Sequence, residues 1–119
     1  MIYTASKLRH APKWREMRAE GWPINSTWID RVEAPPSEFA DIWEHCIKEA
    51  STAQVLVLYR EPDEILKGAF VEIGAALSHG VPVFASGCND LSFIQHPLVT
   101  ICYGVADIKN LLRLKGFRT

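Results

Sequence analysis

Apolar runs of strand length alternate along the chain with segments whose apolar residues recur every three or four positions. The runs that predict β-strands, by their length and the turn residues around them, are residues 1–5, 22–28, 53–60, 81–86 and 98–103. The segments with helical spacing are residues 10–21, a segment starting near Glu38, and residues 67–79 and 104–116. Strands and helices therefore alternate over most of the chain.

This alternation predicts an α/β fold in which helices cover both faces of a parallel sheet. Residues 53–60 form a continuous apolar run, which is typical of a central strand buried on both sides. Pro23 places residues 22–28 at an edge, because proline donates no ladder hydrogen bond. We therefore expect a small flavodoxin-like three-layer sandwich with a five-stranded parallel sheet, formed by residues 1–119 as a single domain.

Composition narrows the range of functions. The chain is 48% apolar and 23% charged with a net charge of −1, which is ordinary for a soluble globular protein. The basic footprint of a nucleic-acid-binding protein is missing, and no apolar run approaches the about 18 residues of a membrane span. The first residues lack a signal-peptide pattern and the three cysteines form no CxxC pair, so we expect a cytoplasmic protein. No spacing indicates a metal site or a cofactor.

Ligands of such sheets bind at the carboxyl ends of the strands. The loops expected at this edge are residues 5–10, 28–33, 59–68 and 86–90. Candidate functional residues are therefore those in these loops and at the helix starts beside them.

One carboxylate, Glu72, interrupts a stretch of mostly small and apolar residues from 67 to 84. Gly68 lies four positions earlier and hence on the same face of the predicted helix, one turn away. A residue without a side chain beside a carboxylate leaves space for a ligand to approach. The alternative is an exposed acid that the helix dipole favours near the start of the helix.

This stretch resembles the motif of the nucleoside 2-deoxyribosyltransferase family, which includes nucleoside 5′-monophosphate N-glycosidases. The matching positions are Gly68, Glu72, Gly74, Ala76, Gly80, Pro82 and Val83. Residues 2–6 are also similar to the first strand and turn of that family, and the order of elements agrees over about the first 90 residues. Other small α/β nucleotide-binding folds, including TIR-like and lysine-decarboxylase-like ones, carry a similar Glu-x-Gly-x-Ala helix.

The resemblance implies that Glu72 attacks the anomeric carbon of a nucleoside or nucleotide while the base leaves. Water then completes hydrolysis, and a second base completes transfer. It also implies that Tyr3 and Ser6, at the end of the first strand, contact the sugar or its 5′ substituent, and that Gly68 leaves room for the substrate. Members of the family are commonly homo-oligomers with shared sites, so we expect a homo-oligomer.

The chain departs from the family in one respect, because an acid usual in the preceding strand is missing. Asp63, in the loop before the predicted helix, is the candidate to orient or protonate the leaving base. The alternative role for Asp63 is a helix N-cap. The missing acid leaves open a non-catalytic nucleotide-binding module on the same fold, and a TIR-like domain that cleaves or senses NAD-type nucleotides is a third possibility.

Three further polar residues lie in the loops of the ligand edge. Arg9, with Ser6, Lys7 and His10, offers a phosphate cations and a hydroxyl near a helix start, unless this is a solvated basic loop. Asp30, close to Trp28, offers a base both stacking and hydrogen bonding, unless it is an ordinary turn acid. The resemblance implies that Asn89 offers the sugar a polar group, unless it only forms a turn.

Overall fold

The computed structural model describes residues 1–118, and its centre is a parallel β-sheet. Within these residues the sheet has four strands, β1 (Ile2–Ala5), β2 (Val55–Tyr59), β3 (Val83–Ser86) and β4 (Val99–Cys102), in the spatial order β1-β2-β3-β4. The β2 strand lies between β1 and β3, with Val57 opposite both Thr4 and Phe84. Its first four residues are fully buried, as the continuous apolar run predicted.

The prediction of a fifth strand at residues 22–28 was wrong. Only Ile24 forms a bridge, pairing in parallel with Ile2 beyond β1. The next ladder bond of a parallel pair would join the Thr4 N–H to the Asn25 carbonyl. That N–H instead donates to Ser26 Oγ over 2.6 Å, and the chain then turns into a 3₁₀ helix, Thr27–Asp30. A side chain therefore replaces the backbone ladder and ends the edge strand after one bridge.

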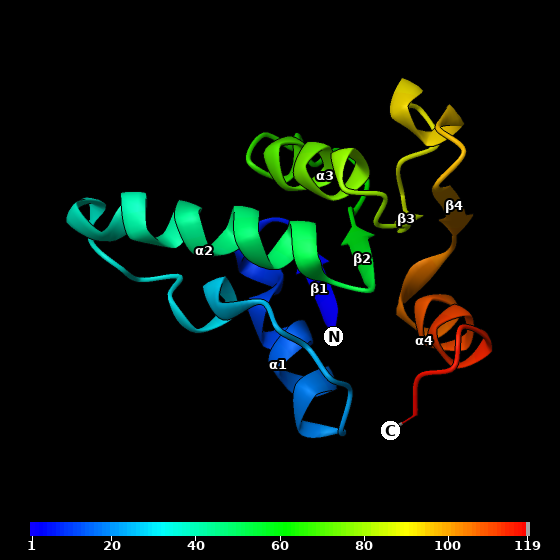
Figure 1. Cartoon of the computed structure of the whole chain (residues 1–119), viewed down its shortest axis with the longest axis horizontal. Helices are drawn as coiled ribbons and strands as arrows, with labels where there is room; N and C mark the ends of the chain where they lie inside the picture. Colours follow the sequence, from blue (N-terminus) through cyan, green and yellow to red (C-terminus); the bar gives the residue numbers. More distant parts are fainter. Residues whose placement is uncertain (119) are drawn as a thin grey trace.

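Helices cover both faces of the sheet, so three layers are confirmed (Figure 1). The helices α2 (Phe39–Thr52) and α3 (Ala69–Ser78) lie on one face, and α1 (Ala11–Ala19) and α4 (Gly104–Leu114) lie on the other. Short 3₁₀ helices, Leu8–His10, Pro36–Glu38 and Ser92–Gln95, join the elements along with Thr27–Asp30. Among residues 1–118, no helix combines the length and the apolar character needed to cross a membrane.

The apolar stripe of α2 is only partly covered by the rest of the molecule. Cys46 is buried, whereas Phe39, Trp43 and Ile47 expose 49%, 38% and 42% of their surface. Fourteen helical residues span about 21 Å, and the five residues of β2 span about 17 Å. The helix therefore extends past the sheet, and its first turns, which lie at the carboxyl edge, face a space that the strands do not fill.

Arginine side chains tie together the loops at the carboxyl edge. Arg9, after β1, binds Glu64 Oε2 over 2.7 Å and Glu61 Oε1 over 3.0 Å, both in the loop after β2. Arg60, in the same loop, binds Asp90 Oδ1 after β3 over 2.6 Å. Three successive ligand-edge loops are thus held in one arrangement around the site.

Candidate active site

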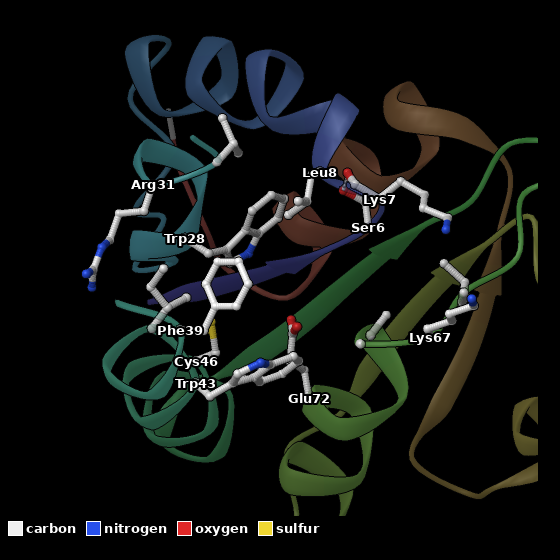
Figure 2. Close-up of a pocket in the computed structure, with 15 residues that line it drawn as sticks. Ser6, Lys7, Leu8, Trp28, Arg31, Phe39, Trp43, Cys46, Lys67 and Glu72 are labelled. Carbon is white, nitrogen blue, oxygen red and sulfur yellow. Dashed lines mark hydrogen bonds between the residues drawn. The ribbon is translucent and has the colours of Figure 1, made fainter. Parts of the chain in front are cut away.

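A cavity of about 350 Å³ opens at the carboxyl edge of the sheet, between α2 and α3. Four segments form its walls: the turn after β1, the 3₁₀ segment around Trp28, the first turns of α2 and the start of α3. Figure 2 shows aromatic rings on one side and the turn after β1 on the other. The cavity therefore lies where the sheet topology predicts a ligand.

The Glu72 carboxylate points into this cavity from α3 (Figure 2). The residue is only 9% exposed, so the alternative of a solvent-exposed acid at the helix start is wrong. Burial raises the pKa of Glu72 to about 7, since the charged form loses its hydration. The Tyr3 hydroxyl partly opposes this rise in pKa, and the negative charge of Glu49 adds to the rise. A carboxyl group that titrates near neutrality at a cavity wall is typical of a functional group.

Tyr3 lies on β1 behind this carboxylate and is fully buried. Its hydroxyl is close to Glu72 and the Cys46 thiol, yet it makes no hydrogen bond of standard geometry within residues 1–118. Burial above all, and then the charge of Glu72, raises the pKa of Tyr3. The phenol therefore keeps its proton and has a free O–H to donate beside Glu72.

Aromatic side chains form much of the cavity wall. Trp28, Phe39 and Trp43 all line it, and the Trp28 indole is fixed by donating from Nε1 to the Thr4 carbonyl over 2.8 Å. Gly68 is what allows Trp43 to lie against the start of α3, because a Cβ at Gly68 would approach Trp43 Cη2 to 3.0 Å. Aromatic walls of this kind suit a flat ring such as a nucleobase.

Gly68→Ala should therefore reduce activity without unfolding the protein. Gly68 has helical dihedral angles, and the Trp43 ring is partly exposed and able to shift. The displaced indole would narrow the cavity beside Glu72, and we expect a loss of about 10-fold in kcat/KM with a nearly unchanged melting temperature. Steady-state kinetics and thermal unfolding of Gly68→Ala check this, with Gly74→Ala as the control, since a Cβ there meets nothing within 4 Å.

The charged residues of the cavity favour an anionic ligand. Three cations line it, Lys7, Arg31 and Lys67, and Glu72 is the only acid among the described lining residues. Arg31 is already paired with Glu38 and Asp41, at 2.8 and 2.7 Å. Lys7 and Lys67 have no acidic partner within residues 1–118, which leaves two ammonium groups available at the cavity.

The structure brings together only some of the residues that the sequence singled out. Ser6, Gly68 and Glu72 line the cavity, with Tyr3 directly behind them. Arg9 lies outside it, held by Glu61 and Glu64.

The remaining three predicted residues also lie outside the cavity. Asp30 pairs with Arg18 on the surface through bonds of 2.8 and 2.9 Å, and Asn89 is exposed. Asp63 is exposed in an open groove beside Arg9, and its φ of 67° is a left-handed turn conformation that Asp tolerates better than most residues. It is not the N-cap of α3, because that position is Gly68.

Sequence reasoning missed Lys67 and the aromatic wall of α2, whereas Lys7 lies in the loop that it singled out for a phosphate. Phe39 and Trp43 lie on an apolar helical stripe, and such a stripe indicates core packing or a dimer face rather than a ligand site. The length of α2 relative to the strands was the signal that part of this stripe extends beyond the sheet.

Comparison with solved structures shows the same fold in an enzyme. The CMP N-glycosidase BcmB of Clostridium botulinum is similar to this chain with a TM-score of 0.59, over 96% of this chain and 98% of that one, at 12% sequence identity. No protein-family model and no curated protein sequence matches the chain. At this identity the similarity establishes the fold, and the residues of the cavity must support any function.

Proposed function

We propose that this protein cleaves the N-glycosidic bond of a nucleoside 5′-monophosphate, with Glu72 as the nucleophile. The observation that carries the proposal is a buried carboxylate that faces an aromatic-walled cavity at the ligand edge of the sheet. The unpaired Lys7 and Lys67 favour a phosphorylated substrate over a nucleoside. The similarity in fold to a CMP N-glycosidase adds support.

In the proposed reaction a Glu72 oxygen forms a bond to C1′ as the C1′–N bond breaks. The bonding electrons leave with the base, and C1′ passes through an oxocarbenium-like state that the carboxylate stabilises. Water then attacks C1′ of the glycosyl ester, releases the sugar phosphate and restores the carboxylate, and the proton that the water loses neutralises the departed base anion. The Tyr3 O–H beside Glu72 orients the carboxylate, and the aromatic rings hold the base.

Base release should depend on pH through Glu72. The nucleophile must be ionised, and its pKa is about 7. We therefore expect kcat/KM to rise about tenfold per pH unit below this value and to level off above it. Initial rates of base release between pH 5 and 9 check this, and a flat profile across that range would exclude titration of Glu72 as the controlling step.

The proposal is tested with a panel of nucleosides and their ribo- and deoxyribo-5′-monophosphates, followed by chromatography of the free bases. We expect release from monophosphates and much weaker release from nucleosides. Addition of a second base distinguishes hydrolysis from transfer, and inclusion of NAD tests the TIR-like alternative. Absence of release from every substrate would overturn the proposal.

A second candidate function is a nucleotide-binding module without catalysis. It is favoured by one observation, namely that Asp63 lies outside the cavity and leaves Glu72 as the only acid among the described residues that line it. Thermal stabilisation by a monophosphate without any base release would identify this function.

We further propose a homo-oligomer, as expected from the sequence. Apolar side chains are exposed on both α2 and α3, including Ile47, Phe70 and Val71, and such surfaces mark interfaces. Light scattering coupled to size exclusion should give a mass of at least two chains, and Val71→Asp should reduce it to one. Ser78→Asp, at the exposed end of α3, is the matched control, and a monomeric wild-type protein would contradict the prediction.

A further inference from the structure

The cavity contains many hydrogen-bond donors and few acceptors. Lys7 and Lys67 carry groups that only donate, and so does Arg31, whose guanidinium is already bound by Glu38 and Asp41. The Trp43 indole N–H is also only a donor, and it has no acceptor within residues 1–118, whereas the Trp28 N–H is used by the Thr4 carbonyl. A ligand that enters this cavity therefore meets free N–H groups.

Side-chain acceptors are almost absent from the same walls. Ser6 Oγ already accepts from Trp14 Nε1 over 2.8 Å and donates to the Lys7 carbonyl over 3.0 Å. The Glu72 carboxylate is engaged at C1′ in the proposed reaction. No Asp, Asn, Gln, His or Thr side chain of the described chain lines the cavity. An amino group on a base would therefore lose its hydration without finding a side-chain acceptor.

We propose that the site selects bases with a carbonyl where others carry an exocyclic amine, so that uracil and hypoxanthine nucleotides are preferred over cytosine and adenine nucleotides. This inference rests on the proposed function and deepens it. A carbonyl oxygen can accept from the Trp43 N–H even while Lys7 and Lys67 bind the phosphate. An amino group brings two N–H donors where the oxo base has one ring N–H, and buried N–H groups without acceptors are strongly disfavoured. The preference differs from the substrate named for the structurally similar enzyme, CMP.

The ability of the base to act as a leaving group favours the same bases. The base leaves with the bonding electron pair, and within residues 1–118 no second acid lines the cavity to protonate it. Uracil and hypoxanthine are stronger N–H acids than cytosine and adenine, so their anions depart more readily without help. Binding and cleavage therefore favour the same bases for independent reasons.

Two matched pairs of substrates test the inference, UMP against CMP and IMP against AMP. Each pair has the same ring size and exchanges an oxo group beside a ring N–H for an amino group beside a bare ring nitrogen. We expect kcat/KM for base release to be about 10-fold or more higher for the oxo member of both pairs. Calorimetric titration of the same four nucleotides separates binding from departure, and we expect the same order in Kd.

The outcomes distinguish this inference from the proposed function. Equal rates within each pair, or faster release of cytosine and adenine, would overturn the selection of oxo bases while base release itself upholds the glycosidase. An acceptor supplied by a second copy of the chain would produce this result. If no base is released, the proposed glycosidase function is wrong, but the dissociation constants still test the selection of oxo bases. Equal dissociation constants within each pair overturn that selection, and tighter binding of UMP and IMP supports it.

Discussion

Glu72→Gln should abolish base release and at the same time make the protein more stable above neutral pH. The amide has nearly the shape of the carboxylate but cannot form the glycosyl ester. Loss of a nucleophile is among the most costly changes in an enzyme, and we expect kcat to fall by about 10³-fold or more. Base release measured at pH 8, where the wild-type carboxylate is charged, checks the first half of this expectation.

The gain in stability follows from the pKa of the same group. Folding raises the pKa of Glu72 from its ordinary value of 4.5 to about 7, so between these values the folded state binds more protons than the unfolded state. Wild-type stability therefore falls as the pH rises through this window, and the buried charge costs up to about 3 kcal/mol above it. Glu72→Gln removes this cost. The net gain in stability is smaller by the free energy that is lost where the amide lacks hydrogen-bond partners.

Urea unfolding at pH 4.5, 6 and 8 measures the effect. The stability of Glu72→Gln relative to wild type should increase across this series, and circular dichroism should show an unchanged fold. Glu44→Gln makes the same chemical change at an exposed position of α2 and should alter neither activity nor stability. An inactive Glu72→Gln that is also less stable at pH 8 would mean that the carboxylate holds the fold together and that the loss of activity is indirect.

The parts of the fold that the sequence predicted are those that local signals determine. The β2 strand was predicted correctly because a continuous apolar run is buried wherever it is placed, and α3 ends near Gly80, whose φ of 73° suits glycine. The edge strand at residues 22–28 was not predicted correctly, because its end depends on Ser26. This side chain binds Thr4, which lies 22 positions earlier in the sequence. Tertiary hydrogen bonds of this kind have no local pattern.

The same distinction applies to the site. Glu72 was recognisable because a charge within a small and apolar helix is unusual, and the structure places it in the cavity. Arg9 has the charge and the loop position expected of a phosphate ligand. Glu61 and Glu64, in a loop that is distant in sequence, bind it instead. Lys67 is in the cavity without such a partner. Whether a loop cation is free or paired depends on which loops meet in space, and spacing along the chain does not encode this.

Gly87→Ala should be the most destabilising of the substitutions considered, although Gly87 lies outside the cavity. Its φ is 80°, and a Cβ there would lie 2.0 Å from the Arg60 carbonyl oxygen. Neither backbone is free to withdraw, because the Arg60 N–H donates to the Ser86 carbonyl over 3.0 Å. We expect a loss of about 3 kcal/mol or more, a large part of the stability of a small protein, and a melting temperature lower by about 10 °C.

Gly80→Ala is the control that separates backbone strain from the clash. Gly80 has a similar φ of 73°, but a Cβ there meets nothing within 4 Å, so this variant should lose only about 1 kcal/mol. The excess loss in Gly87→Ala then measures how tightly the loops after β2 and β3 are packed. Since Arg60 also binds Asp90 in the second of these loops, we expect the clash to loosen the ligand edge and to lower base release even at temperatures where Gly87→Ala remains folded. Equal losses of stability in the two variants would show that the loops separate easily and that the carboxyl edge is not held as one unit.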